Sequence, residues 1–261
     1  MGRTRRDLRM VDVHACLDPG EPRNGRAVEP ERLERELHDA GIVRALVHPG
    51  PRDRGYLAAN NAVARLSVER PFVALARVNG PRDPGRRLPI PARRKEWHTS
   101  PEDVEQFAYD DRFHGFVLDP ARDGLPDEAT LAAMADAGLP TLVFGGEPFP
   151  PDRVATTLLD WAFPLVLTSF GGHPLNRELM HEAIDLLERY DSLYLETSGV
   201  RYREPLERAL TEHPDRVLFG SGVPAVHPSV GVMELLTCSV DESAIERAFD
   251  RNPSRVFPAL D

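Results

Sequence analysis

Side chains able to ligate a metal ion or transfer protons recur where short apolar segments of this sequence end. His14 lies near the end of the segment MVDVHA, and Cys16 lies two residues further along. On an extended strand, two such positions point to the same side. An imidazole and a thiol in this arrangement are suited to holding a metal ion, and the imidazole also to acid–base catalysis. A packed histidine beside a small buried thiol is the structural alternative.

Other reactive side chains follow further apolar segments in the same way. An imidazole and carboxyl groups whose pKa values are shifted apart by burial can exchange protons at neutral pH. We expect such an acid–base set to consist of His14, Asp119 and Glu147. The expected substrate-binding residues are Cys16, His48, Ser169, His173, Glu196, Ser221 and His227.

Several of these residues also have a purely structural interpretation. Asp119 is suited to capping the loop that follows it, and His173 and His227 are suited to solvated loops. Glu196 shares one face of its segment with Tyr194. The pattern alone leaves open whether that face points inward or toward the helices.

Apolar segments and amphipathic segments alternate along the chain, which predicts the elements that position these side chains. Strands are expected at 10–15, 42–48, 72–79, 114–119, 141–145, 165–170, 193–197 and 217–220. The segments between them are long enough for helical crossovers, so the strands can pair in parallel. The pattern predicts an α/β protein with a single (β/α)8 barrel, a fold that typically takes about 250 residues. We expect a disordered tail at 1–9, the barrel at 10–261 and an irregular insertion at 80–100.

A doubly wound open sheet is the alternative fold, but the turn after the first segment, HACLDPG, lacks a dinucleotide fingerprint. In a (β/α)8 barrel the active site lies at the carboxyl ends of the strands. The reactive side chains that follow the apolar segments would therefore converge on one end of the barrel.

The composition limits the classes of molecule that this protein is expected to bind. The net charge is −10 and the sequence holds two cysteines. An acidic chain disfavours nucleic acid and acidic membranes, and no apolar run is long enough to span a bilayer. We expect a cytoplasmic protein with a small-molecule ligand, and a homodimer is compatible with such a barrel.

Five sequence pieces carry a resemblance to a known family. They are VDVHA, FPLVLTSFGGH, LYLETSG, DRVLFGSGVP and RNPSRVF, in this order. In this order and at these spacings the chain resembles the amidohydrolase-related family of TIM-barrel hydrolases and decarboxylases. The resemblance implies a His-x-His pair on the first strand, a histidine at the end of strands five and six, and an aspartate in a GSDxP sequence on strand eight. In the family these groups bind Zn²⁺ or a similar ion, which polarises the substrate and activates water.

The sequence departs from that ligand pattern at most positions. His14 matches the first ligand, but Cys16, Phe144, Ser169 and Gly222 stand where the other four are expected. A catalytic zinc site needs three protein ligands and an open position. We therefore expect no cofactor, with a zinc ion as the alternative.

Three functions remain open. The first is a hydrolase or lyase that acts on a small lactone, amide or carboxylic acid through His14, Asp119 and Glu147 without the family's metal mechanism. The second is a catalytically inactive homologue that binds a small molecule or joins a complex. The third is a metal hydrolase with a rebuilt site of His14, Cys16 and a carboxylate such as Asp119.

Overall fold

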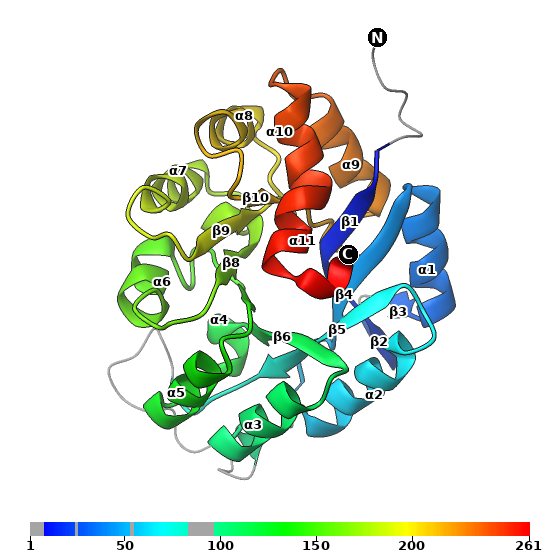
Figure 1. Ribbon diagram of the computed structural model, residues 1–261, viewed down its shortest axis with the longest axis vertical. Helices are drawn as coiled ribbons and strands as arrows, with labels where there is room; N and C mark the ends of the chain where they lie inside the picture. Colours follow the sequence, from blue (N-terminus) through cyan, green and yellow to red (C-terminus); the bar gives the residue numbers. More distant parts are fainter. Residues whose placement is uncertain (1–7, 24–25, 53–54, 83–96) are drawn as a thin grey trace.

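Eight parallel strands form the barrel at the centre of the molecule (Figure 1). The computed structural model describes residues 8–23, 26–52, 55–82 and 97–261. The strands pair in the order β1 (Met10–Cys16), β4 (Ile42–His48), β5 (Phe72–Val78), β6 (Phe113–Leu118), β7 (Thr141–Val143), β8 (Leu165–Leu167), β9 (Leu193–Glu196) and β10 (Val217–Leu218). The predicted (β/α)8 barrel is confirmed.

The barrel closes between its first and last strands, partly beyond the end of β10. The backbone N–H of Val13 donates to the Phe219 carbonyl at 3.0 Å, and that of Gly222 donates to the His14 carbonyl at 3.0 Å. Cys16 donates to the Val223 carbonyl at 2.9 Å. The loop after β10 therefore completes the ladder that the short strand begins.

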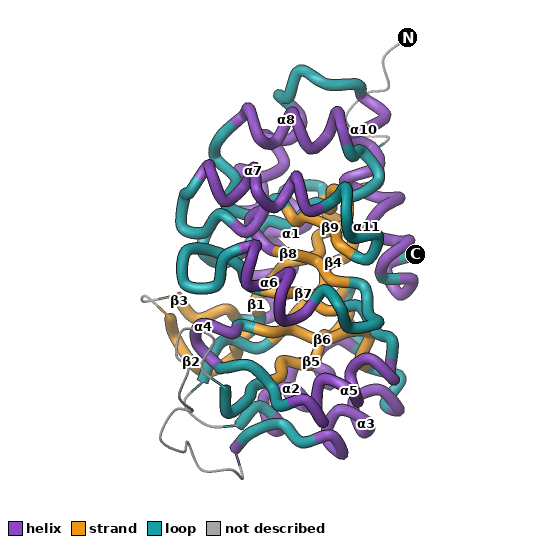
Figure 2. The backbone as a smooth tube through the Cα atoms, turned by 90° about the vertical axis from the view of Figure 1, so that its left-hand side faces the viewer, coloured by secondary structure: helices purple, strands orange, loops and turns teal. Residues whose placement is uncertain are grey.

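Helices surround the strands, and in the side view the strands occupy the middle of the molecule (Figure 2). The helices are α1 (Pro30–Asp39), α2 (Leu57–Ser67), α3 (Pro101–Tyr109), α4 (Pro120–Asp123), α5 (Glu128–Ala137), α6 (Pro151–Leu158), α7 (Arg177–Leu186), α8 (Arg203–Glu212), α9 (Pro228–Leu236), α10 (Glu242–Glu246) and α11 (Asn252–Val256). Several begin with proline, whose missing N–H costs nothing in a first turn. None of the helices in the described ranges is long and apolar enough to cross a membrane.

The segment after β1 contains more regular structure than the expected turn. It forms an antiparallel hairpin of β2 (Asp18–Arg23) and β3 (Arg26–Val28). The hairpin lies outside the barrel sheet, where proline does not interrupt a central ladder. Most of the expected insertion at 80–100 lies outside the described residues; at its start, Arg82 pairs with Leu125 in a short bridge.

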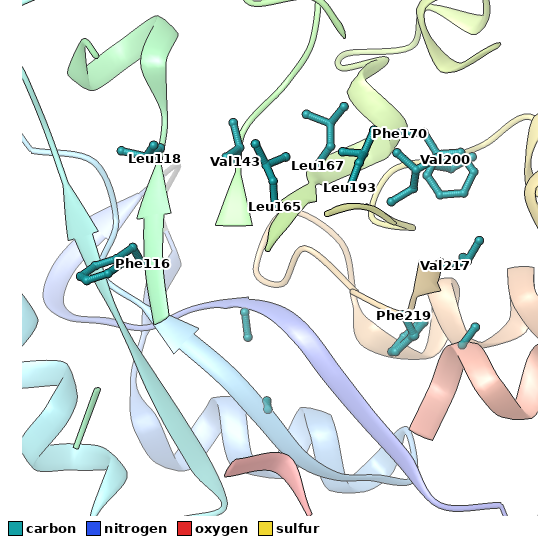
Figure 3. Close-up of a cluster of buried hydrophobic side chains, with 14 of the residues drawn as sticks. Phe116, Leu118, Val143, Leu165, Leu167, Phe170, Leu193, Val200, Val217 and Phe219 are labelled. Atoms are coloured by element: carbon teal, nitrogen blue, oxygen red, sulfur yellow. The ribbon is translucent and has the colours of Figure 1, made fainter. Parts of the chain in front are cut away.

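Apolar side chains pack in two layers. An inner cluster fills the barrel with Val11, Val13, Leu46, Val73, Leu75, Val117, Leu142, Val166, Leu218 and the C-terminal residues Val256, Phe257 and Leu260. An outer cluster packs the other faces of the strands against the helices, and Figure 3 shows members of it on β6 to β10. This alternation along each strand is what lets the barrel bury both faces.

The C-terminal segment closes the end of the barrel where the strands begin. Arg44, near the start of β4, donates to the carbonyls of Ala259 at 2.8 Å and Asp261 at 2.6 Å. Arg9, which we placed in the expected tail, forms an ion pair with Asp250 and a hydrogen bond to the Leu260 carbonyl. The rest of that tail, residues 1–7, lies outside the described residues. The carboxyl ends of the strands lie at the opposite end of the barrel, which is where an active site is expected in this fold.

Candidate functional site

Six side chains from different strands form a layer above the inner cluster, at the carboxyl end of the barrel. We call them the mouth layer: His14, His48, Arg77, Asp119, Phe144 and Glu196. Each belongs to a strand or directly follows one, as expected for a barrel active site.

Glu196 points into the barrel, which answers the question that its alternating pattern left open. Leu193 and Leu195 of β9 belong to the outer cluster, whereas Tyr194 packs against the inner cluster. Alternation then turns Glu196 inward. Its side chain is fully buried and lies 3.2 Å, through Oε2, from Nδ1 of His14.

His14 is held by two residues of the β9 end. Its Nδ1 lies 3.2 Å from Oε2 of Glu196 and 3.1 Å from the hydroxyl of Ser198. Within the described part of the chain, the hydrogen bonds of the ring run through Nδ1, which leaves Nε2 for a substrate or water. The side chain keeps 10% of its surface exposed. A histidine whose second nitrogen is fixed in this way presents a defined tautomer to the mouth.

The Glu196 carboxylate is satisfied on all sides. It accepts the backbone N–H of Ser198 at 2.5 Å, the Ser198 hydroxyl at 2.7 Å and the backbone N–H of Ser169 at 3.2 Å. Gly220 makes room for it, because a Cβ there would lie 1.9 Å from Oε1. A buried carboxylate with this many partners is a fixed acceptor for the His14 ring.

Phe144 packs edge-on against both histidines of the mouth layer. Its ring centroid lies 5.0 Å from that of His14 and 5.8 Å from that of His48, at interplanar angles of 87° in each case. The two imidazoles are 5.5 Å apart, and His48 Nδ1 lies 3.0 Å from the Pro49 carbonyl. Phe144 therefore presents only carbon to the two imidazoles.

Arg77 is the centre of a second buried network, which also contacts the Phe144 ring. Its Nε donates to Asp123 at 2.7 Å and its Nη2 to Asp119 at 3.0 Å. Asp123 also accepts the Tyr56 hydroxyl at 2.8 Å. The guanidinium lies over the rings of Tyr56, at 5.3 Å, and Phe144, at 5.6 Å.

Asp119 is the member of this network nearest the solvent, with 7% of its side chain exposed. Burial raises the pKa of Asp119, and the charge of Arg77 opposes that rise. It follows β6 directly and is the N-cap of α4, but its side chain makes no capping hydrogen bond. The backbone N–H of Arg122 nevertheless lowers the pKa of this carboxyl group, so Asp119 faces both the first turn of α4 and Arg77.

Asp12 joins the first and last strands through Ser221. Its carboxylate accepts the Ser221 hydroxyl at 2.5 Å and backbone N–H groups of Ser221 at 3.0 Å and His14 at 2.9 Å. Ser221, expected to bind substrate, thereby links the first and last strands of the barrel. Complete burial raises the pKa of Asp12 to about 6, with the hydrogen bonds from Ser221 and His14 opposing the rise.

That pKa shift predicts a pH-dependent contribution to stability. The folded protein binds the Asp12 proton more tightly than the unfolded chain, so stability falls as the pH rises through the window between 3.8 and about 6. Urea unfolding of Asp12→Asn and wild type at pH 4.5 and 7.5 measures it. We expect the free energy of unfolding of Asp12→Asn, relative to that of wild type, to be roughly 2–3 kcal/mol higher at pH 7.5 than at pH 4.5. An equal difference at both pH values would contradict this.

The remaining predicted site residues lie apart from the mouth layer or at its edge. Cys16 is half-buried at the end of β1. Glu147 and His173 are exposed and joined through the loop backbone at 2.9 Å, and the Glu147 carboxylate accepts from Asn176 at 3.4 Å. His227 is exposed and caps α9. Among the interactions of the described residues, none brings Glu147 into contact with His14 or Asp119.

Comparisons with known proteins define the class. Residues 107–259 match the family model Amidohydro_2, described as amidohydrolase. The chain belongs to the amidohydrolase family, as its sequence pieces indicated. No protein of curated function matches the sequence.

Solved structures share the fold at low sequence identity. A 5-carboxyvanillate decarboxylase, LigW, from Sphingomonas paucimobilis is 16% identical with a TM-score of 0.69, over 97% of this chain and 99% of that one. A putative 2-pyrone-4,6-dicarboxylic acid hydrolase from Pseudomonas putida is 14% identical with a TM-score of 0.72, over 96% and 98%. A 2,6-dihydroxybenzoate decarboxylase from Rhizobium is 13% identical with a TM-score of 0.66, over 97% and 100%. Such likeness establishes the architecture, and function must be argued from the site.

Proposed function

We propose that this protein is a hydrolase or lyase for a small carbonyl compound (a lactone, an amide or a carboxylic acid) that works without the family's metal mechanism. One observation carries the proposal: His14 is held through Nδ1 by the buried Glu196 and Ser198, at the open end of the barrel. The similar structures named for a pyrone dicarboxylic acid hydrolase and for decarboxylases favour a small carboxylated substrate.

The donor set does not fit the family's metal ion. Among the described residues, no three side chains of histidine, cysteine, aspartate or glutamate come together in a way that could hold one. Phe144 supplies only carbon at its position, and Gly222 has no side chain and a φ of +69° that favours glycine. Nδ1 of His14 is already engaged by Glu196, so this ring could offer a metal ion only its Nε2. We infer that the protein itself has taken over the proton chemistry.

His14 is the proposed general base. With Nδ1 fixed by Glu196, Nε2 can take a proton from a nucleophile and return it to a leaving group. Asp119 is the proposed second acid–base group, because its raised pKa keeps a proton available closer to neutral pH. Arg77 positions the Asp119 carboxyl group and balances its negative charge when the group is ionised.

A small-molecule binder without catalysis is the second candidate, and the Phe144 ring packed against two histidines favours it. A plugged mouth would bind a ligand by apolar contact and leave His14 idle. The two functions differ in whether His14 is needed for turnover or only for packing.

Metal content is the first experiment for the proposed function. We expect protein purified after growth with zinc and manganese to hold far less than one metal equivalent per chain by elemental mass spectrometry. A catalytic site of full occupancy would give roughly one equivalent. Such a stoichiometry, lost on His14→Ala, would overturn the proposal and restore a metal mechanism.

A further inference from the structure

We propose that the hydroxyl of Ser169 is a nucleophile that accepts an acyl group from an ester or a lactone. Ser169 follows β8, in the short turn Thr168–Gly171 at the carboxyl end of the barrel. It retains 8% of its surface, whereas Glu196 beneath it is fully buried. The inference rests on the proposed hydrolase function and narrows its substrate class to acyl compounds with an alkoxide or phenoxide leaving group.

The backbone holds Ser169 in an uncommon conformation. Its φ and ψ are 53° and 29°, and those of Phe170 are 51° and 30°. Left-handed conformations of residues other than glycine cost roughly 1 kcal/mol or more each and persist only when the surroundings fix them. Here the N–H of Ser169 donates to Glu196 at 3.2 Å, and the Phe170 side chain is fully buried. The turn thus fixes the serine at the site.

A chain of hydroxyl groups connects Ser169 to a base. Its Oγ lies 3.3 Å from Oγ of Ser198, which donates to the Glu196 carboxylate at 2.7 Å. Ser198 Oγ also lies 3.1 Å from Nδ1 of His14. With Ser198 donating to Glu196, its oxygen is left to accept from Ser169. A serine becomes nucleophilic when a base can draw off its proton in this manner.

Space for the acyl group lies beside the hydroxyl. Gly199 has a φ of +67°, and a Cβ built on it would meet Ser169 Oγ at 3.7 Å. No other atom of the described residues, apart from the neighbours in the chain, lies within 4 Å of that point. The glycine therefore leaves one side of the nucleophile uncovered.

The acylation step balances as follows. Ser169 Oγ forms a bond to the carbonyl carbon while its proton passes to Ser198 and the Ser198 proton passes to Glu196. The tetrahedral species then breaks its bond to the leaving oxygen, and that oxygen takes a proton back along the same path. In a lactone the leaving oxygen stays attached to the acyl chain.

Deacylation uses the second nitrogen of His14. Water attacks the acyl carbon and gives a proton to Nε2, and the bond from the carbon to Ser169 Oγ breaks. The proton on Nδ1 passes to Ser169 through Ser198, and the ring regains its starting tautomer when Nε2 releases its proton to solvent and Nδ1 takes one up. The net reaction is hydrolysis, with water as its only co-reactant.

A fluorophosphonate probe tests the assignment, because it bonds covalently to an activated serine with loss of fluoride. We expect one adduct per chain in wild-type protein, mapped by peptide mass spectrometry to Ser169. The adduct should be absent in Ser169→Ala, and its rate of formation should fall about 100-fold in Glu196→Gln, which keeps the shape but weakens the base. Ser243→Ala, at an exposed position of α10, is the matched control and should label like wild type. Circular dichroism confirms that each variant folds.

Hydrolysis of dihydrocoumarin and phenyl acetate by the same proteins separates the two proposals. Wild-type hydrolysis with the adduct on Ser169, both lost in Ser169→Ala, supports the nucleophile. Wild-type hydrolysis with no adduct, and with more than half the rate in Ser169→Ala, overturns the nucleophile and leaves direct attack by water. An adduct on Ser198 or Ser221 overturns the assignment to Ser169. Neither hydrolysis nor adduct in folded wild-type protein overturns both proposals.

Discussion

Replacing His14 by glutamine is expected to lower kcat for a hydrolysed lactone by about 10²–10⁴-fold, the range that a general base contributes. Glutamine retains a hydrogen-bonding group near Glu196 but cannot take a proton at neutral pH. The fold should survive, because the carboxylate keeps its bonds from Ser198 and Ser169. Steady-state kinetics across pH 5 to 9 gives the effect on kcat separately from that on KM.

His181→Gln is the matched control for this variant. His181 lies on α7, 2.8 Å from Glu204 and outside the barrel, so the same chemical change there leaves the mouth layer untouched. We expect its kcat to stay within about twofold of wild type, since surface substitutions usually have small effects. Equal activity of His14→Gln and His181→Gln would show that His14 is not a base and would favour the binding function.

Replacing Arg77 by methionine is expected to lower the free energy of unfolding by about 3–5 kcal/mol, because breaking a buried ion pair leaves uncompensated charge. Arg77 is 1% exposed, and its removal leaves Asp119 and Asp123 facing one another without their shared cation. The pKa of Asp119, already raised by burial, should rise further. Stability would then fall as the pH rises from the ordinary aspartate value of 3.8 toward that raised pKa. Urea unfolding at pH 5 and pH 8 measures both effects.

Arg112→Met provides the control for the loss of an arginine. Arg112 is paired with Asp110 at 2.9 Å but is 35% exposed, so solvent screens the pair. Its substitution should cost no more than about 1 kcal/mol. If Arg77→Met costs as little as Arg112→Met at both pH values, the Arg77 network does not hold the mouth together in the way we infer.

The barrel itself was predictable because its sequence pattern is local. Each apolar strand and each amphipathic helix carries its own period, and eight repeats of that pair leave few alternative folds. Residues 18–28 were the exception: Pro19, Gly20 and Pro22 favour a loop, yet these residues pair as a hairpin. That pairing lies outside the barrel ladder, and the apolar periodicity that marks the barrel strands is missing from this segment.

The site was only partly predictable, because alternation fixes which residues share a face and not which way the face points. The inward turn of Glu196 depends on how β9 sits against its neighbours. Arg77 was missed because it lies inside the strand expected at 72–79 and not at its end. A charged residue two positions after Leu75 on the inner face of an apolar strand was the available signal. The bond between Asp12 and Ser221 joins opposite ends of the chain, so no local pattern contains it.

Glu147 shows the limit of inference from position along the chain. It follows β7 closely, as an active-site residue of a barrel would, yet it lies two residues beyond the turn at Gly145 and its side chain contacts Asn176. The nearest residue of that segment to the mouth is Phe144, which packs on His14. Glu147 is only three residues beyond Phe144, but this length of loop places it outside the mouth layer.

The most direct test of the central claim is the lactone hydrolysis rate of protein stripped of metal and assayed with excess chelator, compared with the same protein reloaded with zinc or manganese. Hydrolysis without a resident metal predicts a rate above that of the buffer that stays equal, within about twofold, in all three conditions. A rate that vanishes with chelator and returns with roughly one equivalent of metal would contradict the account and assign the chemistry to a bound ion.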